Sequence, residues 1–320
     1  MNIAFGPVPS RRLGHSLGIN NIPPKSCSYS CLYCQVGATH VQQIEPQVFY
    51  TPDEIVRQVS AQLEKLQSTD QSVDYLTFVP DGEPTLDRNL DRTIDRLRPL
   101  DIPIAVISNA SLLWQDQVRA AITKADWVSL KIDSVNDETW RQLNRPHPEL
   151  KLERVLDGIR AFTRDFRGTY VTETMLINSV NDNDENIAGI ADFIQGINAT
   201  CSYLAVPTRP TSEPEIRAPN ETTLNRCYQI LATKAPRVEY LIGYEGDAFA
   251  FSGDVKQDLL SITAVHPMRE SGIARLLERA LADWSVVDEL VSAGKLKQIT
   301  YLGERFYVRY FPTKNADKDN

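Results

Sequence analysis

Residues 27–34 read Cys27-Ser28-Tyr29-Ser30-Cys31-Leu32-Tyr33-Cys34, so three cysteines stand at the spacing C-x3-C-x2-C. A [4Fe–4S] cube has four irons, and three clustered thiolates provide ligands for three of them. The fourth iron then keeps an open position, which is typical of a catalytic metal site. The spacing therefore predicts one catalytic iron–sulfur cluster held by Cys27, Cys31 and Cys34.

Two other interpretations of these cysteines stay open on spacing alone. A zinc site usually takes four Cys or His ligands in two separated pairs, and His40 is close enough in sequence to be a fourth ligand. A disulfide with one free thiol suits a small secreted chain, whereas this chain has 320 residues.

The composition is that of an ordinary globular protein, with 42% hydrophobic and 24% charged residues. We find no apolar run long enough for a bilayer and no secretory signal at the N-terminus. Five cysteines, three of them clustered, favour a reducing compartment, so we expect a cytoplasmic protein that does not bind membranes. A net charge of −8 argues against nonspecific nucleic-acid binding through a global basic field.

Strand-like and helix-like segments alternate from about residue 13 to residue 245, which predicts an α/β fold with a parallel sheet. The six expected strands are short and apolar: Gly14–Asn20, Tyr75–Val79, Ile102–Ile107, Trp127–Ile132, Tyr170–Ile177 and Tyr203–Val206. The first helix should begin at Pro52, with Thr51 as N-cap and Glu54 closing a capping box. About six β/α units make a partial barrel, since a full one has eight.

In such folds the chemistry gathers at the carboxyl ends of the strands. After the second strand comes Pro80-Asp81-Gly82-Glu83-Pro84. Gly82 lets the backbone approach a ligand closely, and Glu83 can accept hydrogen bonds from an ammonium group. Taken by itself, the same run is also typical of an ordinary Pro/Gly turn.

The next strand ends carry further polar residues. Ser108 and Asn109 follow the third strand, where a helix N-cap is the alternative to a binding role. On the fourth strand, Lys131 and Asp133 share one face, and inward charges are costly unless they are paired or bind a ligand. A buried pair of these two side chains without a ligand is the alternative.

Two more charged residues are candidates for contacts to a substrate. Glu173 lies on the fifth strand and points either into the barrel or towards a helix. Arg209 follows the sixth strand, where a guanidinium group could hold a carboxylate or phosphate; a surface-loop arginine is the alternative.

The pattern changes near residue 250, and we expect a core domain over 1–250, a winged-helix domain over 251–312 and a disordered tail over 313–320. The expected C-terminal elements are a strand Leu259–Thr263, helices Glu270–Ala280 and Trp284–Ala293, and a hairpin of Leu296–Tyr301 with Arg305–Tyr310. This domain has eight basic and eight acidic residues. Sequence-specific DNA binding is therefore not expected, and docking of a substrate or partner, or a structural cap, is favoured.

The cysteine run and Gly82-Glu83-Pro84, together with the segments Gly6–Gly14, Pro23–Lys25 and Pro207–Pro210, resemble the radical S-adenosylmethionine (SAM) superfamily. The resemblance covers nearly the whole chain. It points to the branch of wyosine-synthase-like Fe–S oxidoreductases that carry a C-terminal winged helix. It implies the partial, TIM-like (β/α)6 barrel of the radical SAM core.

The resemblance also implies cofactors and roles. SAM would chelate the open iron, and one electron from the cluster would cleave it to methionine and a 5′-deoxyadenosyl radical. The Gly82–Glu83 element would hold the methionine amino group, although Asp81 stands where the family usually has glycine. Ser108 and Asn109 would contact SAM, Lys131 and Asp133 its carboxylate and ribose, and Tyr33 the adenine; Tyr33 could equally be a packing aromatic.

The resemblance thus leads us to expect an enzyme that abstracts hydrogen from a tRNA base, a peptide or a small metabolite, with reduced ferredoxin or flavodoxin as electron donor. Cys201 and Cys227 read as core thiols, so a second cluster and the wyosine reaction are not expected. The alternative is an Fe–S regulator whose winged helix binds nucleic acid without SAM turnover.

Overall fold

The computed structural model describes residues 2–67, 71–243, 246–247 and 249–311. Its centre is an eight-stranded sheet in the order β1-β2-β5-β6-β7-β8-β9-β10. The strands are β1 (Ala4–Ser10), β2 (Gly14–Ile19), β5 (Tyr75–Phe78), β6 (Ile104–Ser108), β7 (Trp127–Lys131), β8 (Thr169–Met175), β9 (Cys201–Ala205) and β10 (Val238–Leu241). All neighbours from β2 to β10 are parallel, and β1 is antiparallel to β2.

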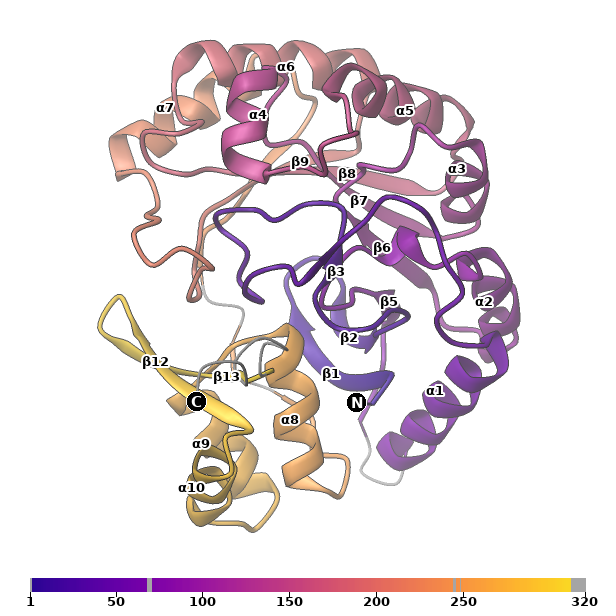
Figure 1. Ribbon diagram of the computed structural model, residues 1–320, viewed down its shortest axis with the longest axis vertical. Coiled ribbons are helices and arrows are strands. Elements are labelled where there is room, and N and C mark those ends of the chain that lie inside the picture. The colour runs from indigo at the N-terminus through magenta and orange to yellow at the C-terminus, as the bar shows by residue number, and fades with distance from the viewer. Residues whose placement is uncertain (1, 68–70, 244–245, 248, 312–320) are drawn as a thin grey trace, which may run out of the picture.

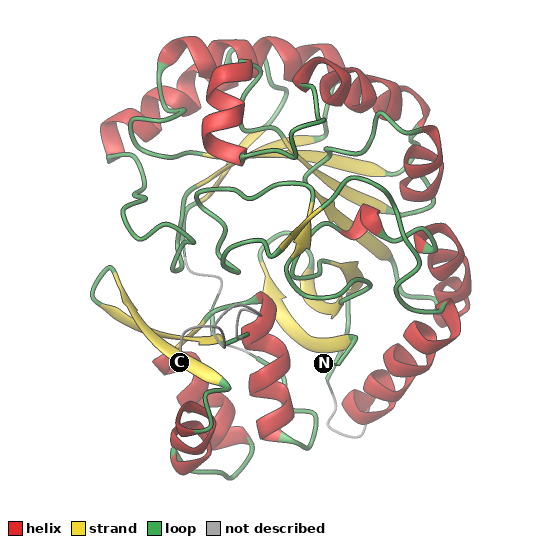
Figure 2. Cartoon of the chain, in the orientation of Figure 1, coloured by secondary structure: helices red, strands yellow, loops and turns green. Residues whose placement is uncertain are grey.

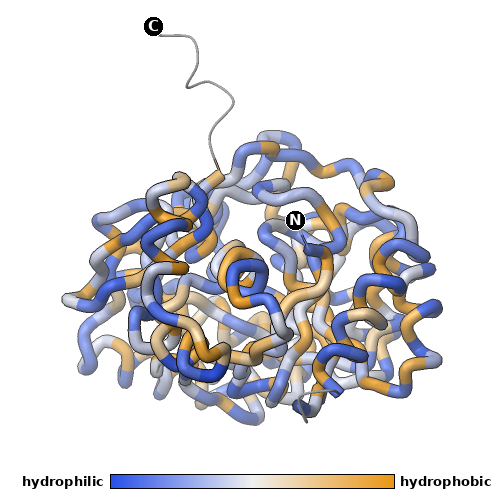
Figure 3. The backbone as a smooth tube through the Cα atoms, turned by 90° about the horizontal axis from the view of Figure 1, so that it is seen from below, coloured by the Kyte–Doolittle hydropathy of each residue, from blue (hydrophilic) through white to orange (hydrophobic). Residues whose placement is uncertain are grey.

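Helices surround the outer face of this curved sheet, as Figure 1 shows. They are α1 (Pro52–Gln67), α2 (Leu90–Leu97), α3 (Asp116–Ile122), α4 (Asp137–Asn144), α5 (Leu152–Asp165), α6 (Asp184–Ile197) and α7 (Glu221–Ala232), with short 3-10 turns η1 (Pro84–Leu86) and η2 (Arg98–Leu100). Along the outer helices hydrophilic and hydrophobic residues alternate (Figure 3), since one side of each helix packs on the sheet. The architecture is a partial, TIM-like barrel of mixed α/β class.

The six predicted strands are confirmed, with ends that differ by one or two residues at most. The start of α1 is also confirmed, because the Thr51 hydroxyl accepts a hydrogen bond from the Glu54 amide at 3.2 Å. Outward residues such as Leu17, Leu76 and Val128 are fully buried against the helices. The alternate positions face the barrel interior, where an apolar cluster that includes Ala105, Trp127 and Val171 lies beside polar residues such as Lys131 and Glu173.

Two strands of the central sheet were not predicted. β1 contains Pro7 and Pro9, which lack an amide hydrogen, and proline in a strand is tolerated mainly at a sheet edge. β1 lies at that edge, and its register with β2 shifts between Phe5 and Val8. β10 has only four residues and extends the parallel sheet past β9.

The C-terminal segment forms three helices and a small sheet: α8 (Val255–Val265), β11 (Met268–Arg269), α9 (Glu270–Arg279), α10 (Ser285–Ser292), β12 (Leu296–Tyr301) and β13 (Glu304–Arg309). The sheet order is β11-β13-β12, and β12 and β13 form the predicted hairpin. Phe249, Ile273 and Leu290 belong to a separate buried cluster within this segment. The tail from residue 313 and Pro312 lie outside the described residues.

The predicted strand over Leu259–Thr263 is wrong, because these residues lie inside α8. Asp254 caps the helix by accepting from the Gln257 amide at 3.1 Å. Leu259 and Ile262 stand three residues apart and are both fully buried, a spacing that one helix face provides. A short apolar run fits either a strand or a buried helix turn, and here the residues form a helix that buries one apolar face.

The C-terminal segment packs on the edge of the barrel. Val8 of β1 contacts its apolar cluster, and the Ala250 amide donates to the Pro7 carbonyl at 3.2 Å. Figure 1 shows α8 beside β1. None of the described helices is long and apolar enough to cross a membrane.

Candidate cluster and cofactor site

The three cysteines lie on a loop that follows β2 and is closed at its base by two short strands. β3 (Ser26–Cys27) pairs in parallel with β4 (Val41–Gln42). The carbonyl of Lys25 accepts from the amides of His40 and Val41 at 2.9 and 3.0 Å. The loop, indigo in Figure 1, lies in front of the sheet among the other loops that Figure 2 shows in green.

Two distant segments hold the far part of this loop. The Leu32 amide donates to the carbonyl of Leu143, in α4, at 3.0 Å. From the loop after β9, the Ser212 amide donates to the Cys34 carbonyl at 2.9 Å, and its hydroxyl donates to the Cys31 carbonyl at 2.9 Å. Ser212 was not predicted as a site residue, since only the folded barrel brings its loop to the cysteines.

Side-chain amides reach two of the sulfur atoms. Asn109 donates from Nδ2 to Sγ of Cys27 at 3.5 Å, and Asn144 donates from Nδ2 to Sγ of Cys31 at 3.4 Å. Asn109 was predicted as a cofactor contact, whereas Asn144, the last residue of α4, was missed. Hydrogen bonds to cluster sulfurs are one way in which a protein tunes an iron–sulfur centre.

The thiols lie in surroundings that disfavour a bare negative charge. Burial raises the pKa of Cys31 to about 12, and it raises the pKa of Cys27 and Cys34 as well. The nearby Cys31 and Cys34 also raise the pKa of Cys27, and Cys34 raises that of Cys31. A bound cation would remove this penalty, because metal ligation stabilises the thiolate.

The donor set fits an iron–sulfur cluster better than a single ion. In the described part of the chain no three His, Cys, Asp or Glu side chains converge on one metal position. The ligands of a [4Fe–4S] cube need not meet at one position, because each cysteine binds a different iron. Thiolates are also the soft ligands that such clusters prefer. His40, the possible fourth zinc ligand, is exposed on the loop.

Gly82 permits a contact between backbone segments. A Cβ atom at this position would lie 1.9 Å from the carbonyl oxygen of Ser26, and Gly82 has a φ of +151°. Ser26 and Gly82 form an isolated bridge, and the Glu83 amide donates to the same carbonyl at 3.1 Å. The turn after β5 is therefore joined directly to the residue before Cys27.

Asp81, which departs from the family pattern, has a partner of its own. The ammonium of Lys25 lies 2.8 Å from one carboxylate oxygen of Asp81, and both side chains are buried. Burial nevertheless raises the pKa of Asp81 to about 6, while Lys25 opposes that rise. The Lys25 amide also donates to the Asp81 carbonyl at 2.8 Å, so the pair is a second link between the two loops.

Glu83 is completely enclosed and ties β5 to the end of β6. Its Oε1 accepts from the Thr85 amide at 3.1 Å, the Thr85 hydroxyl at 2.6 Å and the Ser108 hydroxyl at 2.8 Å. Its Oε2 accepts from the Asn109 amide at 2.7 Å. Burial raises the pKa of Glu83, and all the groups that oppose this rise are neutral donors. The predicted residues Glu83, Ser108 and Asn109 thus form one cluster.

Inside the barrel, Lys131 pairs with Glu173 and not with Asp133. Its Nζ donates to Oε1 of Glu173 at 2.6 Å, while Nη1 of Arg12 donates to Oε2. Burial would raise the pKa of Glu173, but the two cations outweigh it and lower this pKa to about 2. Arg12, from the turn between β1 and β2, was not predicted as part of the site.

Asp133 lies just beyond β7 and belongs to a different network. Its Oδ2 accepts from the Tyr33 hydroxyl and from Nδ2 of Asn144 at 2.8 Å, and its Oδ1 accepts from the Met175 amide at 2.8 Å. Burial raises the pKa of Asp133, although Lys131 and these donors oppose the rise. Tyr33 is buried in this network, and the Lys131 ammonium lies 5.2 Å from the centre of its ring.

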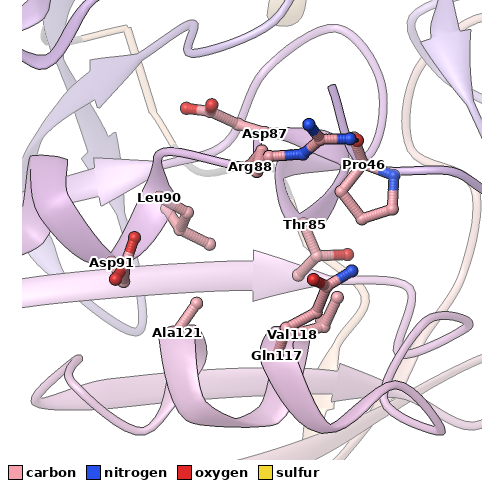
Figure 4. Close-up of a pocket in the computed structure, with 9 residues that line it drawn as sticks. All are labelled: Pro46, Thr85, Asp87, Arg88, Leu90, Asp91, Gln117, Val118 and Ala121. Carbon is pink, nitrogen blue, oxygen red and sulfur yellow. Dashed lines mark hydrogen bonds between the residues drawn. The ribbon is translucent and has the colours of Figure 1, made fainter. Parts of the chain in front are cut away.

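The structure has cavities on both sides of the sheet. Arg209 lines an interior cavity together with Arg12. A second cavity opens between α2 and α3, and Thr85, Asp87, Arg88 and Asp91 are among the residues that line it (Figure 4). None of the predicted site residues lines this outer cavity.

Cys201 and Cys227 are both buried, as expected of core thiols.

Comparisons with known proteins agree with this geometry. The family model of the radical SAM superfamily matches residues 21–191. A UPF0026 protein of Methanocaldococcus jannaschii is 43% identical over 322 aligned residues, covering 100% of both chains.

Two solved structures share the fold. A radical SAM methyltransferase from Sphaerobacter thermophilus superposes with a TM-score of 0.54 at 19% identity, covering 70% of this chain and 66% of that one. TYW1 with a lysine–pyruvate adduct bound gives a TM-score of 0.53 at 15% identity, covering 69% of this chain and 74% of that one. At these identities the likeness concerns the fold alone.

Proposed function

Because this chain belongs to the radical SAM superfamily, we propose that it is an enzyme that removes a hydrogen atom from its substrate by radical chemistry. When bound, a [4Fe–4S] cluster and SAM supply that chemistry, since one electron cleaves the sulfonium of SAM to methionine and a 5′-deoxyadenosyl radical. The observation that supports the proposal most is that Asn109 joins the cysteine loop to the Glu83 cluster, since its side-chain amide donates to Sγ of Cys27 and its backbone amide donates to Oε2 of Glu83. The proposed substrate is a tRNA base, a peptide or a small metabolite.

We propose that Cys27, Cys31 and Cys34 hold the cluster and that two amides orient it. Asn109, which follows β6, and Asn144, at the end of α4, each donate to a cysteine sulfur. These amides would keep the sulfurs in place and adjust the electron affinity of the centre.

Glu83 is the proposed contact for the methionine amino group. A carboxylate oxygen can accept two hydrogen bonds or more, and Oε2 receives one from Asn109. An ammonium at Oε2 would also supply the positive charge that the neutral donors around Glu83 lack. Gly82 would act indirectly, because it allows this turn to touch the cysteine loop.

Lys131 is the proposed contact for the SAM carboxylate. Its Nζ has three N–H donors, and one of them is used by Glu173. For Asp133 and Tyr33 we propose a positioning role in place of direct contact with ribose and adenine. Both oxygens of Asp133 are already engaged by protein donors, and Tyr33 donates to one of them.

The proposal is tested by anaerobic reconstitution with iron and sulfide, followed by incubation with SAM and dithionite. We expect 5′-deoxyadenosine, measured by chromatography, in amounts that rise with time. If none forms while iron and sulfide are stoichiometric, the proposed function is wrong.

A pair of cysteine variants sharpens this test. Cys31→Ala should lose both the cluster absorbance and the cleavage of SAM. Cys227→Ala removes a buried thiol far along the chain and should keep both. Equal iron content in the two variants would contradict the assignment of Cys31.

The C-terminal segment is proposed to be a winged-helix domain that begins near residue 251. Its order of helix, strand, two helices and hairpin is typical of that fold, and its own apolar cluster supports a separate unit. Its equal numbers of basic and acidic residues favour docking of a substrate or partner over sequence-specific DNA binding.

Reduced ferredoxin or flavodoxin in the cytoplasm is the proposed electron donor.

The alternative, an Fe–S regulator that binds nucleic acid without SAM turnover, is not favoured. This alternative assigns no ligand to the enclosed Glu83 cluster or to the charged side chains inside the barrel. Cluster-dependent retention on DNA without formation of 5′-deoxyadenosine would support it.

A further inference from the structure

The interior cavity lies between the barrel and the C-terminal segment. It has a volume of about 110 Å³, whereas one water molecule needs roughly 10–15 Å³ by the same measure. Its wall comes from β1, β2, β5 and β6, from the loop after β9 and from the end of α8. The polar lining residues are Ser10, Arg12, Ser16, Thr77, Arg209 and His266.

Two buried nitrogen atoms on this wall lack partners among the described residues. They are Nε of Arg12 and Nε2 of His266. His266 is only 5% exposed, and burial with the nearby charge of Arg209 holds its pKa well below the usual range. A neutral imidazole can carry a proton on Nε2, and a buried donor without an acceptor costs about 1–3 kcal/mol.

The charge around the cavity favours an anion. Arg12 and Arg209 both line it, and no Asp or Glu is among the described lining residues. Glu173 engages Nη1 of Arg12, but Lys131 shares that carboxylate, so the three side chains together keep one positive charge.

Arg12 is also held in place before any ligand binds. Its guanidinium carbon lies 5.9 Å from the ring centres of both Trp127 and Tyr203, and Nη1 donates to Oγ of Ser129 at 3.5 Å. A fixed guanidinium loses little freedom on binding, which favours recognition of a carboxylate or phosphate.

We propose that the interior cavity binds the carboxylate or phosphate group of the substrate, with Nε of Arg12 and Nε2 of His266 as donors and Arg209 as a second cation. The word substrate rests on the proposed function, whereas the binding of an oxyanion does not. The C-terminal segment thereby gains a role, since His266 at the end of α8 completes the wall.

The test measures the melting temperature of reconstituted protein in inorganic phosphate or acetate against chloride at equal ionic strength. We expect at least one oxyanion to raise the melting temperature in a saturable way. A larger shift with phosphate would identify a phosphate-bearing substrate, and a larger shift with acetate a carboxylate-bearing one. No shift with either would overturn the inference.

His266→Phe is the decisive variant, because it keeps an aromatic ring against Phe249 and removes the nitrogen. The affinity for the oxyanion should fall about tenfold, while stability without anion should be unchanged or higher, since no partner is lost. His15→Phe, at an exposed histidine, should leave the affinity unchanged. Unchanged affinity in His266→Phe, or an equal loss in His15→Phe, would contradict the assignment.

Arg209→Gln is a second variant and should also weaken binding about tenfold. Saturating SAM separates the two possible anions: a phosphate or acetate shift that persists in SAM supports a substrate site, and one that SAM abolishes assigns the cavity to SAM itself and overturns the inference. Formation of 5′-deoxyadenosine without any oxyanion shift would refute this inference alone. An oxyanion shift without 5′-deoxyadenosine would refute the proposed function alone.

Discussion

The barrel encloses two glutamates in opposite ways. Glu83, after β5, is surrounded by neutral donors, and burial raises its pKa. Glu173, on β8, lies between two cations that lower its pKa to about 2. Glu83 accepts four hydrogen bonds and Glu173 accepts two, yet the pKa of Glu173 is the one that is lowered, so the number of bonds does not explain the difference.

Charge, more than the number of hydrogen bonds, decides whether a buried carboxylate is stabilised as an anion. Glu173 already has its counterions, and its role is to fix Arg12 and Lys131. Glu83 has donors without positive charge, which leaves a place for a cationic ligand. We therefore expect the two residues to respond differently to substitution, to pH and to SAM.

The largest effect is expected from Glu173→Ala. It leaves Arg12 and Lys131 buried without their shared carboxylate, which should lower the free energy of unfolding by about 3–5 kcal/mol. Denaturant unfolding checks this value. The double variant Glu173→Ala with Lys131→Met should recover part of the loss, and a loss no larger than in Lys131→Met alone would contradict the ion cluster.

The pH dependence of stability should separate the two glutamates. The pKa of Glu173 falls from 4.5 to about 2 on folding, so its contribution is present above the unfolded pKa and is lost as the pH falls towards 2. A shift of this size is worth on the order of 3 kcal/mol. Glu83 acts in the opposite sense, because its raised pKa makes the fold less stable as the pH rises above the unfolded value.

Unfolding curves measured from about pH 2 to about pH 6, a range around the pKa of ~4.3 of a free glutamate, check the direction of both pH dependences. Glu173→Gln should reduce the loss of stability at low pH, and Glu83→Gln should reduce the opposing slope, to which the raised pKa values of Asp81 and Asp133 also contribute. If Glu173→Gln loses as much stability at low pH as the wild type does, another carboxylate causes that loss.

Glu83→Gln should have a smaller effect on stability at neutral pH. The new amide group places donors near the Asn109 amide, which then loses its acceptor, at a cost of about 1–3 kcal/mol. SAM binding, measured by calorimetry on reconstituted protein, should weaken more than in Glu173→Gln. Equal affinity in wild type and Glu83→Gln would refute the proposed ammonium contact.

The smallest effect is expected from Ser108→Ala, which removes one of the four hydrogen bonds to Glu83. The free energy of unfolding should fall by about 0.5–1.5 kcal/mol. The pKa of Glu83 should rise further in this variant, which a shift of the opposing pH slope would reveal. No change in either quantity would mean that the Ser108 hydroxyl is not engaged.

Local patterns in the sequence predicted the repeating part of the fold. Tyr75–Phe78 and Trp127–Lys131 are short and apolar, and both are strands as expected. β1 was hidden by Pro7 and Pro9, because a strand at a sheet edge can use residues that a central strand cannot. The helix over Leu259–Thr263 was mistaken for a strand, since both patterns fit so few residues.

The part of the site that lies within one short motif could be predicted from the sequence. Cys27, Cys31 and Cys34 needed only their spacing. Arg12 and Asn144 were missed because their partners lie far along the chain: Glu173 is 161 residues from Arg12, and Cys31 is 113 residues from Asn144. Contacts of this kind exist only after the barrel has closed.

The edge position of β1 has a practical consequence for truncation. One side of β1 pairs with β2, and α8 with residue Ala250 covers the other side. A chain cut before Ala250 would present a strand with unsatisfied hydrogen-bonding groups and exposed apolar residues such as Val8, which favours pairing between molecules. We expect the barrel alone to self-associate, so the full chain is the form to purify.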